Sequence, residues 1–279
     1  MRHRFHQLDV FTATALLGNP LAVVHAAQSL DDARMAAFAR WTNLSETTFL
    51  LPPTQPQADY RVRIFTPGGE LPFAGHPTLG SCRAWLAGGG QPRTPGVVVQ
   101  ECGVGLVPVR VEPGGQRLAF AAPACGQEPV EPGLLRRVVA ALGVPASSVR
   151  QASWLDNGPR WLALELPDAQ AVLALRPDHG ALKTLAKVGV VGAHAPPGPV
   201  HFEVRAFAAP LGVPEDPVTG SLNASLAQWL MADGRAPDTY VAAQGTALGR
   251  AGRVHVRRDA HGTWIGGDVV ICIDGSVEL

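Results

Sequence analysis

The sequence predicts an α+β protein built from two similar halves. Three observations predict this class: strand-like segments alternate with helical ones, 31 glycines and 25 prolines separate them, and one short motif occurs twice. The two copies lie 140 residues apart in a chain of 279, which is half its length. A repeat at this spacing indicates a duplicated unit of ordinary domain size.

The composition is that of a folded protein with balanced charge. The chain has 23 basic and 23 acidic residues, and 46% of its residues are hydrophobic against 16% charged. Zero net charge gives no overall attraction to nucleic acid or to an anionic membrane surface. No apolar run approaches the roughly 20 residues that a membrane span needs. We therefore expect no nucleic acid and no membrane among its partners.

The N-terminal region and the cysteines point to the cytoplasm. Asp9 and a turn at residues 18–20 interrupt the apolar stretch near the N-terminus, unlike the continuous core of a secretory signal. No cysteine pair has the Cys-x-x-Cys spacing of a metal site. The four cysteines are Cys82, Cys102, Cys125 and Cys272. We expect them to be reduced and mostly packed in apolar surroundings, with no bound metal and no cofactor.

In the first half, alternating apolar residues predict strands and capped apolar stretches predict helices. Residues 60–65 show the alternation most clearly, with Tyr60, Val62 and Ile64 on one face. One helix follows the acidic cap at residues 31–32, and another runs over 77–86 to the glycines at 88–90. The predicted strands are 5–11, 21–25, 46–51, 60–65, 97–100, 104–111 and 118–121.

The second half follows the same alternation. Its predicted helices are 133–142, 170–175, 179–186 and 217–231, and its predicted strands are 161–166, 188–193 and 201–207, with a run of strands to the C-terminus. We assign residues 1–115 to the N-terminal half, which a C-terminal strand at about 268–279 would complete. Residues 116–267 form the C-terminal half.

The repeated motif predicts an anion site at two helix starts. Residues 76–81 and 216–221 share a polar residue, Pro, Gly and Ser in the same order. His76 and Asp216 are predicted as N-caps, each followed by a proline at the first helical position. Free N–H groups at such a helix start attract anions. Two of them, related by a pseudo-twofold axis and facing each other across a cleft, would suit a small carboxylate substrate. The alternative is that both residues only cap helices.

Proton transfer also requires an acid or a base near these helix starts. The candidates are His76, Asp216, Glu46 and Glu70. Burial that raises the pKa of a carboxyl would suit general acid–base catalysis near neutral pH. Sequence spacing does not decide which carboxylate takes this role.

Five segments resemble the signatures of the PhzF-like phenazine-biosynthesis family. They are residues 9–11 with 18–20, 43–47, 65–80 and 214–221. The resemblance implies the diaminopimelate-epimerase-like fold, in which each of two pseudo-symmetric halves is a mostly antiparallel sheet wrapped around a central helix. The active site of that fold lies between the halves.

The resemblance also implies an activity and a set of site residues. A familiar member is an isomerase that moves a proton on trans-2,3-dihydro-3-hydroxyanthranilate without a cofactor, and the family implies a homodimer. Carried over, Glu46 is the proton shuttle, with His76 and Asp216 as its polar catalytic partners. The implied substrate-binding residues are Asn19, Gly75, Gly220 and Ser221.

Two other functions stay open at this point. The epimerase branch of the superfamily uses two opposed cysteines, and the matching positions here are Ala74 and Thr219. Neither residue can act as a thiol base, which argues against racemisation by two thiols. The alternatives are a non-catalytic protein that binds a carboxylate metabolite, and an epimerase or lyase of the same superfamily.

Overall fold

The computed structural model describes all residues from 1 to 279, and the chain divides into two compact units. The first unit comprises Met1–Ala121 together with Gly266–Leu279, and the second comprises Ala122–Ile265. The C-terminal segment therefore belongs to the unit that begins the chain. The two units are described separately below.

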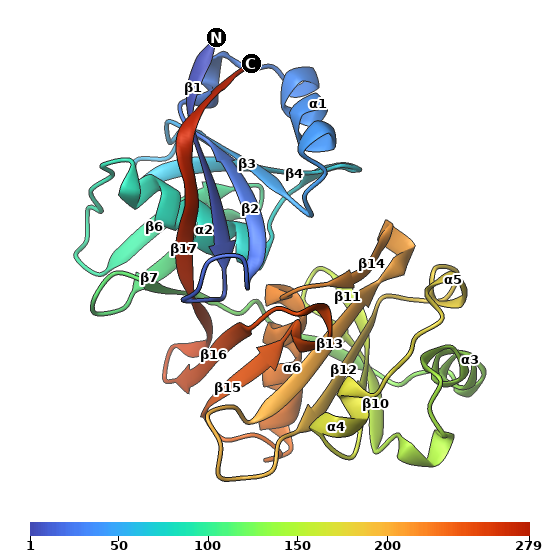
Figure 1. The fold of residues 1–279 in the computed structure, drawn as a ribbon. Coiled ribbons are helices and arrows are strands. Elements are labelled where there is room, and N and C mark those ends of the chain that lie inside the picture. Colours follow the sequence, from blue (N-terminus) through green and yellow to red (C-terminus); the bar gives the residue numbers. More distant parts are fainter. The chain divides into compact units, whose positions relative to one another are not determined.

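The strands of the first unit pair into a closed, barrel-like sheet. The pairing runs in the order β1, β2, β3, β4, β6, β7, β8, β17 and back to β1 (Figure 1). Only β2–β3 and β4–β6 are parallel among these pairs. The strands are β1 (Arg2–Val10), β2 (Asn19–Val24), β3 (Thr47–Leu51), β4 (Tyr60–Thr66), β5 (Gly69–Leu71), β6 (Val97–Cys102), β7 (Gly105–Val111), β8 (Arg117–Ala121) and β17 (Gly262–Glu278). Closure leaves no free sheet edge in this ring.

One helix of the first unit is buried and the other covers the outside of the sheet. Helix α2 (Gly75–Ala87) contacts strands all round the barrel. The fit is close, because a Cβ added at Gly80 would lie 2.4 Å from a methyl group of Leu21. Helix α1 (Asp32–Thr42) packs with Phe38 against Phe49 of β3. The barrel interior thus fixes the position of α2 and of its first turn.

The second unit has a sheet in the same mixed style. Antiparallel pairs dominate, and β11–β12 and β13–β15 are parallel. The strands are β9 (Gly126–Glu128), β10 (Gln151–Asp156), β11 (Arg160–Glu165), β12 (Val188–Ala193), β13 (Phe202–Ala208), β14 (Val213–Asp216), β15 (Thr239–Gln244), β16 (Gly252–Asp259) and the first residues of β17. The helices are α3 (Pro132–Leu142), α4 (Ala169–Leu173), α5 (His179–Leu182) and α6 (Gly220–Ala232).

Helix α6 is the buried helix of the second unit. Most of its residues are inaccessible to solvent, and it contacts β10 and β16. A Cβ added at Gly189 of β12 would lie 2.3 Å from a methyl group of Leu222 of α6, so a larger residue there would displace the Leu222 side chain. Helices α3, α4 and α5 contribute to a separate hydrophobic cluster of this unit, with apolar residues such as Leu142 and Val172. Four short 3-10 helices complete the chain: Ala27–Ser29, Ala146–Ser148, Ala209–Leu211 and Thr246–Leu248.

The mixed α and β class predicted from the sequence is confirmed, but the predicted helix caps are wrong. The N-caps of α2 and α6 are Ala74 and Thr219, not His76 and Asp216. His76 is the second residue of α2, and Asp216 ends strand β14. The physical reason in the second unit is that Asp216 continues pairing with β13, which delays the helix. Proline at the third position of α2 is tolerated because the first-turn N–H groups have no helical acceptor.

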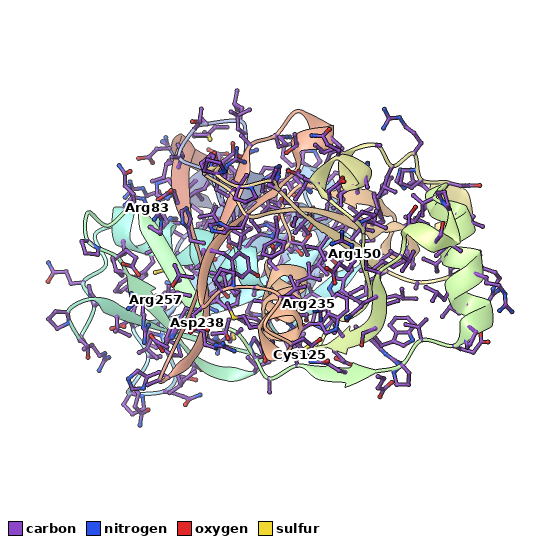
Figure 2. The ribbon with its side chains drawn as sticks, turned by 90° about the horizontal axis from the view of Figure 1, so that it is seen from below. Arg83, Cys125, Arg150, Arg235, Asp238 and Arg257 are labelled. Atoms are coloured by element: carbon purple, nitrogen blue, oxygen red, sulfur yellow. The ribbon has the colours of Figure 1, made fainter.

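The cysteines are all free, and they differ in burial. Cys82 lies inside α2 and is buried, while the other three are partly exposed. Cys125 lies beside α6 (Figure 2), and its thiol donates to the carbonyl of Gly126 at 3.4 Å. Arg235 stacks over Trp229 at the end of the same helix (Figure 2). Burial raises the pKa of the Cys125 thiol, so it is a poor nucleophile at neutral pH. No helix has both the length and the apolar character required to cross a membrane.

Candidate active site

The first unit brings together three of the predicted site residues. Glu46 lies directly before β3, and its Oε2 is 3.5 Å from Nδ1 of His76. Asn19 begins β2, and its Nδ2 is also 3.5 Å from Nδ1 of His76. His76 and Asn19 are buried, and the Glu46 side chain is 17% exposed. A carboxyl group, an imidazole and an amide thus meet beside the first turn of α2.

The short connection after α1 explains the position of Glu46. Helix α1 ends at Thr42, and its C-cap Asn43 adopts a left-handed conformation with a φ of 53°. Asparagine tolerates this conformation better than most residues. The hydroxyls of Thr42 and Thr47 then hydrogen-bond across the turn at 2.9 Å. The turn is therefore closed at its base, and Glu46 is held at the entry to β3.

His76 is neutral over the physiological range. Burial lowers its pKa from 6.5 to about 3, and a hydrogen bond to the Pro20 backbone opposes this shift only in part. Depending on the tautomer, Nδ1 either carries a hydrogen that faces Glu46 or accepts a hydrogen bond from the Asn19 amide. A neutral ring that can adopt either tautomer can exchange its hydrogen-bonding role when the adjacent carboxyl gains or loses a proton.

Glu70, the other carboxylate considered from the sequence, is engaged elsewhere. Both of its carboxylate oxygens accept hydrogen bonds from Arg63, at 2.7 and 2.6 Å. Arg63 also contacts Asp32 at 2.6 Å. Glu70 therefore belongs to a surface ion-pair network, and Glu46 is the carboxylate beside His76.

In the second unit, a different cluster of polar side chains surrounds Asp216. The hydroxyl of Thr219 donates to Oδ2 of Asp216 at 2.6 Å. Gln244 donates through Nε2 to the Thr219 hydroxyl and to the Asp216 carbonyl, at 2.9 and 3.1 Å. Asn223 donates to Oε1 of Gln244 at 2.8 Å and to the Thr219 carbonyl at 2.9 Å. The carboxylate is held by a connected network of buried side chains.

Ser221 and Gly220 begin α6 and lie next to this network. Gly220 is the first helical residue, as Gly75 is in α2, and Ser221 is the second, as His76 is in α2. The Ser221 hydroxyl accepts a hydrogen bond from the indole of Trp161 at 3.2 Å. Its carbonyl accepts from Asn157 at 2.9 Å.

The helix starts correct the alignment of the two sequence motifs. Ala74 and Thr219, the two N-caps, lie 145 residues apart, whereas the two copies of the sequence motif lie 140 apart. His76 therefore corresponds in helix position to Ser221 and not to Asp216. The matching proline and glycine in the two motifs hide this five-residue difference, because the proline lies inside α2 but before the start of α6.

Sequence reasoning missed several residues of the second group. The sequence predicts no role for Gln244, Trp161 or Asn157, and it marks Thr219 only as a position without a thiol. Gln244 comes from β15, far along the chain from Asp216, and no sequence motif marks it. The role of a buried glutamine at the end of a strand can be recognised only in the folded structure, where the helix packs beside it.

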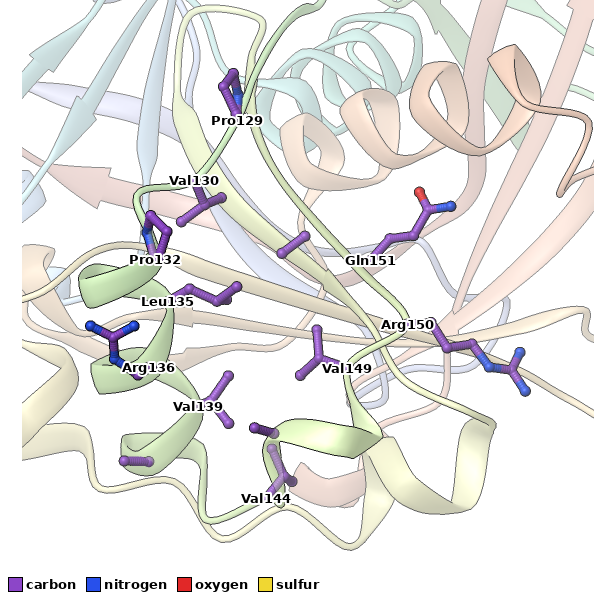
Figure 3. Close-up of a pocket in the computed structure, with 13 residues that line it drawn as sticks. Pro129, Val130, Pro132, Leu135, Arg136, Val139, Val144, Val149, Arg150 and Gln151 are labelled. Carbon is purple, nitrogen blue, oxygen red and sulfur yellow. The ribbon is translucent and has the colours of Figure 1, made fainter.

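A hollow of about 690 Å³ in the second unit lies away from these residues. It is bounded by α3 and β10, and apolar side chains such as Leu135, Val139 and Val149 line it (Figure 3). Arg136 and Arg150 are at its edge, with their guanidinium groups directed away from it. None of the predicted site residues is among its lining residues, so it has no acid–base group of the candidate site.

Solved structures show the fold class of this chain. The crystal structure of a Bacillus anthracis phenazine biosynthesis protein of the PhzF family matches with a TM-score of 0.87 over 100% of both chains, at 21% identity. A probable proline racemase from Agrobacterium radiobacter matches more distantly, with a TM-score of 0.65 at 14% identity, over 99% of this chain and 92% of that one. The chain therefore has the mixed α/β fold shared by these proteins.

The sequence comparisons identify the family. A model described as phenazine biosynthesis-like protein matches residues 8–275. Trans-2,3-dihydro-3-hydroxyanthranilate isomerase of Pseudomonas aeruginosa is 36% identical over 267 residues, covering 93% of this chain and 92% of the relative. Antisense-enhancing sequence 1 of Schizosaccharomyces pombe is 36% identical over 292 residues, covering 98% of each. The chain belongs to the phenazine biosynthesis-like protein family, and it is an enzyme of the isomerase class.

Proposed function

We propose that this chain is a cofactor-independent isomerase that moves a proton on a small carboxylate substrate by general acid–base catalysis. The reaction would resemble that of trans-2,3-dihydro-3-hydroxyanthranilate isomerase, the name of one relative. The observation that carries the proposal is the Glu46 carboxyl 3.5 Å from a buried, neutral His76. A positioned carboxyl beside a polarisable ring is suited to taking a proton and returning it at another carbon.

The proposed roles follow from chemistry and position. Glu46 is the proton shuttle, and His76 and Asp216 are its catalytic partners. Gly75, Gly220, Ser221 and Asn19 bind substrate. The first-turn N–H groups of a helix have no helical acceptor and favour a negative charge, which supports carboxylate or enolate binding there.

A carboxylate base is favoured over a pair of thiols. The family resemblance puts the bases of the two-cysteine epimerases at Ala74 and Thr219, which are the two N-caps, and neither is a thiol. Cys82 is the one cysteine on α2, and burial raises the pKa of its thiol well above the ordinary value. An epimerase or lyase that uses Glu46 remains the alternative within the same superfamily.

We also propose that the chain arose by duplication, with halves at 1–115 plus 268–279 and at 116–267. The two units share the sequence of antiparallel and parallel pairs: β2–β3 and β11–β12 are parallel, as are β4–β6 and β13–β15. A homodimer in the cytoplasm completes the proposal, and sedimentation of the purified protein tests the dimer.

The test is isomerisation in deuterated solvent. Purified protein is incubated with trans-2,3-dihydro-3-hydroxyanthranilate and with related small amino carboxylates in D2O, and product and deuterium content are followed by NMR and mass spectrometry. We expect conversion of at least one compound, with deuterium at the carbon that receives the proton. Ligands that stabilise the fold in thermal-shift measurements but neither isomerise nor exchange would instead support a non-catalytic carboxylate-binding protein.

A further inference from the structure

A buried amide on β15 ties together the residues that precede and begin α6. Gln244 is 1% exposed. Its Oε1 accepts hydrogen bonds from the Thr219 backbone N–H at 3.0 Å and from Asn223 at 2.8 Å. Its Nε2 donates to the Thr219 hydroxyl and to the Asp216 carbonyl. Both acceptor sites and both donor protons of the amide are therefore used.

The hydrogen bonds of this amide have one direction. A backbone N–H can only donate, so the contact with Thr219 identifies which end of the Gln244 amide is the oxygen. The other end must donate to the Thr219 hydroxyl, and that hydroxyl then directs its own proton to Oδ2 of Asp216, 2.6 Å away. The order runs from amide to hydroxyl to carboxylate, which leaves Oδ2 as an acceptor.

We propose that Thr219 and Gln244 are positioning residues that hold Asp216 as a hydrogen-bond acceptor for the substrate. The inference rests on the proposed role of Asp216 in the isomerase. A carboxylate that accepts a short hydrogen bond from a hydroxyl held by buried side chains is restricted to one rotamer. The same hydrogen bond favours the charged form of the carboxylate. Asp216 then accepts from a substrate group or takes its proton, and Oδ2 does not supply one.

The first unit provides the matched comparison. Gln100 is fully buried on β6, donates to the Thr78 hydroxyl at 3.0 Å and accepts from the Tyr60 hydroxyl at 2.9 Å. Thr78 donates in turn to the carbonyl of the N-cap Ala74, at 2.9 Å. Ala74 has no hydroxyl, so this glutamine steadies a helix start without reaching a carboxylate.

The experiment measures the titration of the Asp216 carboxyl directly. Protein labelled with 13C at aspartate carboxyl carbons is titrated by NMR, and the Asp216 signal is assigned with Asp216→Asn. In Thr219→Val we expect the titration midpoint to rise by about one pH unit, because the charged form loses a donor. In Thr219→Ser we expect the midpoint of the original protein, because serine keeps the donor hydroxyl. Gln244→Leu, which adds no charge, also raises the midpoint, because the Thr219 hydroxyl loses the donor that orients its proton toward Oδ2.

The control is Gln100→Leu, which removes the equivalent glutamine of the first unit and should leave the Asp216 midpoint unchanged. An unchanged midpoint in Gln244→Leu or in Thr219→Val, with a wild-type circular dichroism spectrum, would overturn the proposal. If Thr219→Val does not fold, Gln244→Leu decides it. Because the titration requires no substrate, failure of the proposed isomerase activity would be seen separately in the D2O experiment. If activity is present, the acidic limb of kcat/KM should shift with the midpoint.

Discussion

The first turns of α2 and α6 have the same backbone construction and different chemistry. In both, the N-cap side chain makes no capping bond, and the residue four positions later returns a hydrogen bond to the N-cap carbonyl. In both, a buried glutamine from the strand after the helix supports that residue. The side chains at the second helical position differ: a neutral imidazole in one, a hydroxyl in the other. The comparison shows that two helix starts can share the same supporting hydrogen bonds while the side chains available for acid–base chemistry differ.

A second matched pair shows how burial differs between the units. Arg63 forms a two-bond pair with Glu70, and Arg205 forms one with Glu215 at 2.9 and 2.8 Å. Both guanidinium groups lie about 5 Å from a phenylalanine ring two residues later on the same strand. The side chains of the second pair are only 6% and 7% exposed, against 20% and 41% for the first.

The largest stability effect is expected from breaking the buried pair. Arg205→Met leaves Glu215 without its partner in a desolvated place, which should cost about 3–5 kcal/mol. Arg63→Met removes a more exposed pair and should cost no more than about 1 kcal/mol. Urea unfolding of both variants measures the difference. Equal losses would show that burial does not separate the two pairs.

Acid should weaken the first unit through His76. Because burial lowers the pKa of folded His76 to about 3, the unfolded chain binds a proton below pH 6.5 that the folded chain does not. Stability is therefore complete above pH 6.5 and falls as the pH falls, by about 1.5 kcal/mol between pH 6.5 and 5 from this residue. Ser221, at the matching position of α6, has no such titration.

His76→Asn removes the titrating group and should flatten the decline by that amount. Urea unfolding at pH 6.5 and pH 5 gives the comparison, and hydrogen exchange of the α2 amides locates the loss. If the variant and the original protein weaken equally on acidification, His76 does not titrate as its burial implies.

The smallest effect is expected at the hydroxyl of the second unit. Trp161→Phe keeps the ring but removes the indole donor to Ser221, which costs one hydrogen bond of about 0.5–1.5 kcal/mol. We expect KM to rise by up to about tenfold with little change in kcat. Trp154→Phe, in a strand of the same unit, is the control and should leave KM as it was. A fall in kcat alone would place Ser221 in the chemical step.

Much of the fold was accessible from the sequence because strands and helices carry periodic apolar patterns. Tyr60, Val62 and Ile64 alternate in β4 as predicted, and all three are buried. The helix predicted over 77–86 also matches α2 to within two residues at each end. Family resemblance pointed to Glu46 and His76, which the structure places side by side.

The remainder depends on tertiary structure. The start of α6 was misplaced because Asp216 continues a strand pair with β13, which no local pattern reveals. Gln244 was missed because its importance comes from a backbone N–H and a hydroxyl that reach it only after packing. The parallel pair β4–β6 likewise requires a contact between strands separated by a whole helix.

The account depends most on Glu46 as the residue that moves the proton. Glu46→Gln keeps the size of the side chain and removes its capacity to shuttle a proton. A matched control is Glu203→Gln, since Glu203 also lies beside a histidine, 3.1 Å from His194, with no proposed catalytic role. The measurement is the rate of deuterium incorporation from D2O into substrate and product, on folded protein of each variant. We predict a loss of about 10²- to 10⁴-fold for Glu46→Gln and an unchanged rate for Glu203→Gln. Undiminished exchange in Glu46→Gln would contradict the account.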